Sequence, residues 1–252
     1  MMKILITGDS HTAALQRGLK ALRAQGALRE GVEVSVTPLG GGHVLPTPFW
    51  RDAGDHAEII APGYRAQFTR LPPQQPAPDV LGLCMPLWPM RILHRMAGEK
   101  LALADRIADH ATVSKAVFRQ LVQADQQHVL GLIDLFNRIR MPCVALSPPV
   151  LFADHKVLSR YPAAQALRIF DTYRAIMLTE LAARDVPVID LPPEARQADG
   201  FMRPDFRHDD PQDAHHANAA FGALMIRRLQ DWAQDRAQDR AQDQASSTVR
   251  PA

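Results

Sequence analysis

Short apolar runs recur along the chain, and longer segments with helical spacing separate them. The runs do not alternate between apolar and polar residues over their length, which is typical of strands buried on both faces. We expect five strands, at residues 3–7, 32–37, 80–85, 143–147 and 186–191. Apolar or small residues at helical spacing predict helices at 13–27, within 100–137 (one or two helices), at 163–184 and at 217–232. Strands that alternate with helices indicate a mainly parallel sheet with helices on both sides.

Two segments depart from this alternation. Residues 43–78 are rich in proline and glycine, and we expect a long excursion over one sheet edge, of a kind that is usually functional or loosely ordered. From residue 233 the chain repeats Ala-Gln-Asp-Arg, whose four-residue period stacks on one helix face but leaves no apolar stripe. We therefore predict one domain over 1–233 and a low-complexity tail at 234–252, first a frayed helix and then disordered.

Composition narrows the function classes. The 252 residues are 46% hydrophobic, enough for a full core, and the formal charge is +2. Since no basic cluster with interleaved aromatics appears, nucleic-acid binding is not expected. The first apolar run is too short for a signal peptide, and no stretch reaches the length of a membrane span. Cys84 and Cys143 lie in apolar runs and are expected to be buried thiols rather than a disulfide. We expect a cytoplasmic protein.

The first predicted strand runs into Gly8-Asp9-Ser10 and then into a helix. One interpretation is structural: Asp9 or Ser10 caps the helix by accepting hydrogen bonds from its free N–H groups. The other is chemical, because N–H groups at a helix start stabilise the negative charge that forms when a serine attacks a carbonyl. A dinucleotide-binding turn is excluded, since Ser10 and Ala13 stand where that motif needs glycine.

Three glycines, Gly40, Gly41 and Gly42, follow the second predicted strand. They lie at the edge of the sheet where open α/β folds hold their ligands. Without side chains, the backbone there is able to approach a ligand closely. A tight turn is the alternative explanation, although one glycine is enough for a turn.

Asp213 precedes His216 by three residues, just before the last predicted helix. At this spacing the acid accepts from one ring nitrogen and leaves the other free to take a proton from a serine. The alternative is that Asp213 caps the helix and His216 only packs. A metal site is a third interpretation, because acids and imidazoles crowd here, at His208, Asp209, Asp210, Asp213, His215 and His216. Neighbouring pairs are expected to point their side chains apart, so we predict no metal and no cofactor.

Taken together, Gly8-Asp9-Ser10, the glycines after the second strand and the Asp-x-x-His motif resemble the SGNH (GDSL-type) hydrolase family over residues 2–233. The resemblance implies a flavodoxin-like three-layer α/β/α sandwich with a five-stranded, mainly parallel sheet. It implies that Ser10 is the nucleophile and, through its N–H, an oxyanion donor, with Gly42 as second donor. Asp213 would be the orienting acid and His216 the general base.

The chain departs from the family pattern in two places. Asn218 stands where the family often has asparagine, but Ala217 replaces the usual proline. After the third strand the family has Gly-x-Asn-Asp, whose asparagine completes the oxyanion hole, whereas this chain has Pro86-Leu87-Trp88-Pro89. Trp88 takes the place of that asparagine. Its indole N–H is one potential donor, and an apolar wall for the acyl group is the alternative role.

These observations predict a serine-dependent esterase or acyl-transfer enzyme of SGNH type. Its substrate would be a small or carbohydrate-linked acyl ester, with neither nucleic acid nor membrane as a partner. The alternative is a catalytically weak or inactive protein of the same fold that binds a small molecule or glycan. The intact serine, histidine and aspartate favour the enzyme, and the missing asparagine favours the binding protein.

Overall fold

The computed structural model describes residues 1–248, and the side chains of residues 1–238. Its centre is a five-stranded sheet with the order β10-β9-β6-β1-β2, and all four strand pairings are parallel. The strands are β1 (Met2–Gly8), β2 (Val32–Val36), β6 (Val80–Cys84), β9 (Cys143–Leu146) and β10 (Val188–Ile189). This order is the flavodoxin-like one, so the predicted fold class is confirmed.

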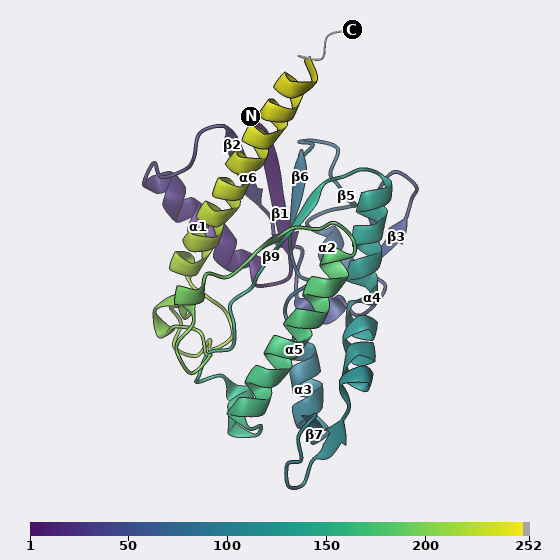
Figure 1. Ribbon diagram of the computed structural model, residues 1–252, viewed down its shortest axis with the longest axis vertical. Coiled ribbons are helices and arrows are strands. Elements are labelled where there is room, and N and C mark those ends of the chain that lie inside the picture. Colours follow the sequence, from purple (N-terminus) through teal and green to yellow (C-terminus); the bar gives the residue numbers. More distant parts are fainter. Residues whose placement is uncertain (249–252) are drawn as a thin grey trace.

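Helices cover both faces of the sheet (Figure 1). One layer holds α1 (Thr12–Ala24) and α6 (Ala219–Thr248), and the other holds α3 (Met90–Gly98), α4 (Lys115–Arg138) and α5 (Ala163–Ala182). The sequence did not predict α3, because its segment follows a proline-rich exit from β6. Residues 100–137 contain a single helix, preceded by the parallel pair β7 (Leu101–Leu103) and β8 (Ala111–Val113).

β2 differs from the expectation that every strand is buried on both faces. Its residues alternate between buried and exposed positions, with Val32, Val34 and Val36 facing the core and Glu33 and Ser35 exposed. As the outermost strand, β2 has one face covered by α1 and α6. Alternation is the pattern of a half-buried strand.

The proline-rich excursion at 43–78 is folded. It contains an antiparallel sheet of β3 (Trp50–Asp52), β4 (Ala57–Ile59) and β5 (Arg70–Leu71), together with the short helix α2 (Pro62–Arg65). Phe49, Ile59 and Tyr64 from this segment are almost completely buried, so it adds its own apolar side chains to the core. Four 3₁₀ turns complete the described structure: η1 (Gly42–Val44), η2 (Lys156–Ser159), η3 (Pro193–Ala195) and η4 (Pro204–Phe206).

The predicted tail is helical for most of its length. α6 continues through Thr248 and projects beyond the body (Figure 1), where the sequence predicted first a frayed helix and then disorder. Alanine, glutamine and arginine all have high helix propensity, and Arg–Asp pairs three residues apart add to it. The first tail residues also make contacts, since the Arg236 guanidinium lies over the Trp232 ring. Residues 249–252 lie outside the described part.

Two expectations about the environment of the chain concern cysteine and membranes. Cys84 and Cys143 are buried and free, as predicted. Within residues 1–248, every helix is too short or too polar to cross a lipid bilayer. The cytoplasmic location stays a prediction.

α1 and α6 cross at unusually close range through two glycines. A Cβ atom added at Gly222 would lie 1.8 Å from the carbonyl oxygen of Ala14, and one added at Gly18 would lie 2.1 Å from the amide nitrogen of Ala223. Only glycine lets the two backbones approach this closely. The crossing brings the first turns of the two helices side by side, although they lie near opposite ends of the chain.

We expect Gly222→Ala to lower the free energy of unfolding by about 3 kcal/mol, the upper part of the range for overpacking, because the added methyl forces the helices apart. Urea denaturation measures the change. Gly131→Ala, within α4, is the matched control, since its added methyl would meet only Trp50, at an ordinary 3.5 Å. The control should be neutral or up to about 1 kcal/mol more stable. Equal losses in the two variants would contradict the tight crossing.

Candidate active site

Ser10 lies at the carboxyl end of β1, directly before α1. Gly8 allows this turn to pass close to β6, since a Cβ added there would lie 2.1 Å from the carbonyl oxygen of Cys84. The Ser10 hydroxyl lies 3.0 Å from Nε2 of His216. This hydroxyl accepts no N–H group of α1 among the described residues, and the N–H of His11, directly before the helix, donates to Oδ1 of Asp9 instead. The structural interpretation of Ser10 as a helix cap is therefore wrong.

His216 connects Ser10 to Asp213. Its Nδ1 lies 2.8 Å from Oδ2 of Asp213, and the Oδ1 atom of the same carboxylate accepts the backbone N–H groups of His215 and His216, each at 2.9 Å. Burial alone would raise the pKa of Asp213, but the hydrogen bonds from His216 and His215 outweigh it and hold the pKa well below its usual range. Asp213 therefore stays ionised and fixes the His216 proton on Nδ1.

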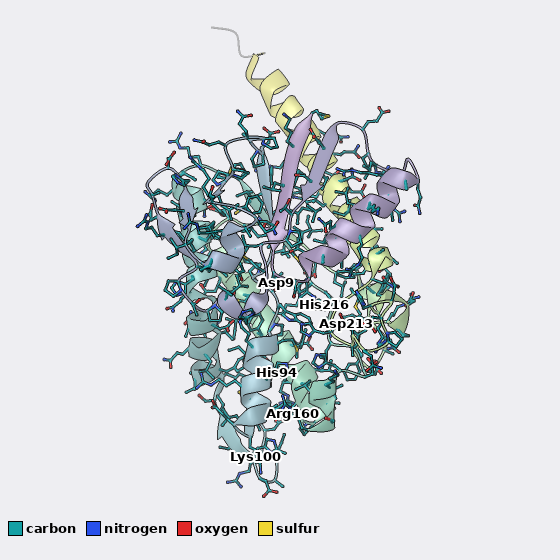
Figure 2. The ribbon with its side chains drawn as sticks, turned by 180° about the vertical axis from the view of Figure 1, so that it is seen from behind. Asp9, His94, Lys100, Arg160, Asp213 and His216 are labelled. Atoms are coloured by element: carbon teal, nitrogen blue, oxygen red, sulfur yellow. The ribbon has the colours of Figure 1, made fainter. Side chains whose placement is uncertain are left out.

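The loop that carries Asp213 and His216 is anchored on both sides. Arg17 of α1 donates to the carbonyl oxygen of Ala217 at 2.7 Å, and the N–H of His208 donates to the carbonyl oxygen of His216 at 3.1 Å. Asn218 caps α6, since its Oδ1 accepts the N–H of Phe221 at 3.1 Å. The alternative in which Asp213 caps this helix is therefore wrong. Figure 2 shows Asp9, Asp213 and His216 together beyond the ends of the strands.

Gly42 lies against Asp9, because a Cβ added to Gly42 would be 3.3 Å from both Cβ and Oδ2 of that residue. Two side chains hold the glycine loop. The Tyr64 hydroxyl donates to the carbonyl oxygen of Gly41 at 2.7 Å, and Nη1 of Arg91 donates to that of Gly42 at 2.9 Å. The Nε and Nη2 atoms of the same guanidinium donate to the two carboxylate oxygens of Asp125, at 2.8 and 2.7 Å, and so hold Arg91 in place.

Asp9 is the second carboxylate near Ser10, and its surroundings are opposite to those of Asp213. Burial raises the pKa of Asp9 to about 6, against the lowering effects of the His11 N–H and of the Arg91 charge. Its Oδ1 accepts the N–H of His11 at 3.0 Å. Asp9 thus closes the turn around Ser10, and among the described residues its carboxylate makes no hydrogen bond to an imidazole ring.

Trp88 lies behind this turn, in the loop between β6 and α3, and its side chain is buried. Its ring centroid is 4.0 Å from that of His11 and 5.1 Å from that of His215. The rings of His215 and His216 are themselves in contact, with centroids 4.7 Å apart. The expectation that adjacent histidines point apart is therefore wrong here, because the loop turns both rings toward His11.

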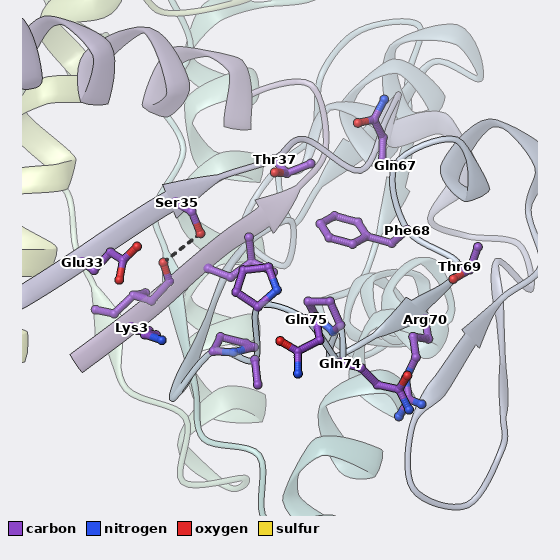
Figure 3. A pocket seen from close by; sticks show the side chains of 16 residues that line it. Lys3, Glu33, Ser35, Thr37, Gln67, Phe68, Thr69, Arg70, Gln74 and Gln75 are labelled. Atoms are coloured by element: carbon purple, nitrogen blue, oxygen red, sulfur yellow. Dashed lines mark hydrogen bonds between the residues drawn. The ribbon is translucent and has the colours of Figure 1, made fainter. Parts of the chain in front are cut away.

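Cavities lie on two sides of the molecule. One of about 360 Å³ borders the candidate site and is lined by residues that include His155, Asp213 and His215. A larger one, of about 560 Å³, lies between the outer strands and the excursion, beside Ser35 and Phe68 (Figure 3). Ser10 and His216 line neither cavity, but Asp213, which is hydrogen-bonded to His216, lines the smaller one, so the smaller one is the candidate substrate site.

Comparisons with solved structures support the fold. A protein described as lipolytic and of the G-D-S-L family, from Desulfitobacterium hafniense DCB-2, aligns with a TM-score of 0.51 and 12% identity over 92% of this chain and 99% of its own. A protein described as a platelet activating factor from Streptococcus pneumonia aligns with a TM-score of 0.52 and 11% identity, over 92% and 83%. A GDSL-like lipase from Bacteroides thetaiotaomicron VPI-5482 gives a TM-score of 0.48 and 10% identity, over 93% and 88%. No protein-family model and no curated protein matches the chain.

The chain has the SGNH (GDSL-type) hydrolase fold. Within this SGNH fold, the structure brings the predicted Ser10, His216 and Asp213 into one hydrogen-bonded line. Gly42 lies beside the Ser10 turn, and Trp88 lies against the ring of His11. All the residues predicted for the site are therefore close together, whatever the role of each.

Sequence analysis missed several side chains of this candidate site. Tyr64 and Arg91 come from segments whose position relative to the glycine loop no local pattern shows. His11 has a sequence signal, since it directly follows Ser10. His155 lies on a different loop and reaches His215 only in the folded chain, with 3.2 Å between its Nε2 and Nδ1 of His215.

Proposed function

We propose that the protein is a serine-dependent ester hydrolase or acyl-transfer enzyme of SGNH type. The observation that carries the proposal is the continuous line from the Ser10 hydroxyl through the His216 ring to the Asp213 carboxylate, with distances of 3.0 and 2.8 Å. Nucleophile, base and orienting acid need this order and these distances.

In the proposed reaction, the lone pair on Nε2 of His216 accepts the proton of the Ser10 hydroxyl. Ser10 Oγ attacks the ester carbonyl carbon while its proton passes to Nε2, and Asp213 stabilises the resulting imidazolium. When the tetrahedral intermediate collapses, the carbon–oxygen bond to the alcohol breaks, and the departing oxygen takes the proton from His216. Water or an acceptor alcohol then attacks the acyl-serine, again with His216 as base, and restores free Ser10.

Two backbone N–H groups are available for the negative charge of the intermediate. Neither Ser10 nor Gly42 donates its N–H to any residue that the structure describes. In a trans peptide the C=O and N–H groups point in opposite directions, so the Tyr64 bond to the carbonyl oxygen of Gly41 fixes the direction of the Gly42 N–H. Burial raises the pKa of Tyr64 far above its usual value, which keeps the hydroxyl protonated as a donor. Tyr64 is therefore a positioning residue for the oxyanion hole.

Trp88 takes the sequence position of the missing family asparagine, and its enclosure favours the role of a wall. The indole is buried and packs on His11 and, with ring centroids 5.4 Å apart, on Phe170. A ring held between neighbours in this way shapes an apolar boundary for an acyl group. In the alternative role, its single N–H would be a third oxyanion donor.

The lining of the adjacent cavity favours a hydroxylated substrate. Its polar side chains include those of His155, Lys156, Asp210 and Gln212, which offer donors and acceptors to sugar hydroxyls. A small acyl ester on a carbohydrate fits this combination of a polar cavity and an apolar wall at Trp88. The rival proposal is a non-catalytic glycan-binding protein, favoured by the absent asparagine.

We expect a fluorophosphonate probe to label Ser10 covalently, because His216 is placed to take the hydroxyl proton. Intact-mass spectrometry measures the single adduct, and Ser10→Ala should prevent it while leaving the circular dichroism spectrum unchanged. No adduct on the folded wild-type chain would favour the binding protein. Labelling that persists without Ser10 would remove this serine from the mechanism.

The two adjacent histidines provide a matched test of the base. His216→Ala should lower turnover of an aryl or sugar acetate by several orders of magnitude, as loss of a triad base does elsewhere. His215→Ala should cost far less, since its ring contacts His155 rather than the serine. The reverse order of losses would show that the wrong histidine is assigned.

Tyr64→Phe should lower kcat about tenfold with little change in KM, a fraction of the roughly 10²–10³-fold cost of losing a whole oxyanion donor. Tyr161→Phe is the matched control, since it removes a buried hydroxyl that also donates to a backbone carbonyl, that of Leu101 at 2.6 Å. If both variants lose stability equally and neither changes kcat, Tyr64 is only structural.

Trp88→Phe keeps an aromatic ring but removes the N–H. If Trp88 is a wall, we expect turnover to change only a few-fold, with Trp88→Ala acting mainly on KM. A fall of about 10²–10³ in kcat for the phenylalanine variant would instead identify the indole as an oxyanion donor. Steady-state kinetics on one acetate ester distinguishes the two roles.

A further inference from the structure

Four imidazole rings gather beside Ser10. The ring centroid of His11 lies 5.0 Å from those of both His215 and His216, and that of His155 lies 5.5 Å from His215. One ring nitrogen from each of His11, His215 and His216 lies within 4.8 Å of the other two. The proposed esterase reaction uses only His216 of this group.

His11 is the unexplained member. Its side chain is almost completely buried, yet neither ring nitrogen has a hydrogen-bond partner among the described residues. A neutral imidazole has one N–H and one unshared lone pair, and in His11 both lack a partner among the described residues. Buried polar atoms in native proteins nearly always have a partner. The orphaned His11 nitrogens therefore indicate a ligand.

The His216 ring is oriented as metal ligands commonly are, and the His215 ring has one nitrogen without a hydrogen bond within the described part of the chain. His216 gives its Nδ1–H to Asp213, which leaves the Nε2 lone pair on the side of Ser10. A carboxylate on the far nitrogen is the usual support of a metal-binding histidine. Nδ1 of His215 faces His155, so Nε2 is its free nitrogen. Neutral imidazoles suit zinc and similar divalent transition metals.

We propose that His11, His215 and His216 form a binding site for a divalent transition-metal ion of the zinc class, and that the bound ion blocks Ser10. Tetrahedral zinc–nitrogen bonds put ligand nitrogens about 3.4 Å apart, so the three nitrogens, now within 4.8 Å, must close by no more than about 1.4 Å. Water would complete the coordination. The metal takes the Nε2 lone pair of His216, which then no longer accepts the Ser10 proton. This blocking effect rests on the proposed function, whereas binding itself does not.

The hydrogen bond between His155 and His215 competes with metal binding and limits the affinity of the site for the ion. Nδ1 of His155 accepts the N–H of Val157 at 3.2 Å, so the proton of a neutral His155 is on Nε2 and points at Nδ1 of His215. Binding metal through Nε2 of His215 puts a proton on that same Nδ1. The His155–His215 bond must then break, which favours reversible binding over a permanent structural site.

Binding is tested on the full chain with Co²⁺, whose visible absorption reports histidine ligation, and with Zn²⁺ as competitor. We expect one equivalent of Co²⁺ to bind. His11→Phe keeps the ring packed on Trp88 but removes both nitrogens, and it should weaken binding at least about 100-fold. His215→Phe, on a less buried side chain, is a second variant in case the first fails to fold. His128→Gln, on α4 outside the cluster, is the control and should bind normally.

Ser10→Ala provides a test that does not depend on activity. Since Ser10 and the ion compete for the same lone pair, this variant should bind Co²⁺ several-fold more tightly than the wild type. In the wild type, Zn²⁺ should abolish fluorophosphonate labelling and ester turnover, EDTA should restore both, and His11→Phe should resist the inhibition.

The possible failures are distinguishable. If the wild type does not bind one equivalent of Co²⁺, or if both His11→Phe and His215→Phe bind Co²⁺ as tightly as the wild type, the proposed metal site is wrong. Binding that leaves turnover unchanged overturns the block alone. If the chain hydrolyses no ester at all, the proposed function fails, and the Co²⁺ spectra still decide whether the metal site exists.

Discussion

The crossing of α1 and α6 determines whether this molecule has a site at all. Ser10 precedes α1 and His216 precedes α6, so the two side chains meet only if both helices begin side by side. Gly222 makes this possible, because its missing side chain lets the α6 backbone rest on Ala14, in the first turn of α1. Arg17 adds a hydrogen bond from α1 to the loop before α6. The close contact at Gly222 therefore brings together Ser10 and His216, whose side chains form a hydrogen bond although the residues are 206 positions apart.

The two carboxylates near Ser10 show how environment assigns different roles to the same group. Asp213 is partly exposed and accepts three N–H groups, so its negative charge is stable and available to a protonated imidazole. Asp9 is buried with fewer donors, and burial raises its pKa to about 6. A full negative charge at Asp9, next to Gly42, would oppose an oxyanion there. The Arg91 guanidinium, fixed by Asp125 and by the Gly42 carbonyl, offsets that charge.

The sequence pattern predicted those features that depend on residues close together in the chain. Buried apolar runs located all five strands of the main sheet, and the spacing of Asp213 and His216 predicted their hydrogen bond. Pattern failed where distant contacts decide. α3 is missed because prolines suggested a loop, and the excursion at 43–78 is ordered by burying residues such as Tyr64 in the core. The same limit applies to the site: the hydrogen bond from Tyr64 to Gly41 joins residues on separate elements, and no motif in either segment indicates it.

The histidine cluster also explains why the positive charge of a reaction intermediate would settle on one ring. Burial is the main cause that lowers the pKa of both His155 and His215 to about 4, and His11 is buried more completely still. Only His216 among the four has a carboxylate within hydrogen-bonding distance, at 2.8 Å. In the proposed reaction, the Asp213 carboxylate would therefore stabilise a proton that passes from Ser10 to His216. One imidazole paired with a carboxylate, among neighbouring rings that have none, is the arrangement that both the proposed proton transfer and the proposed metal binding need.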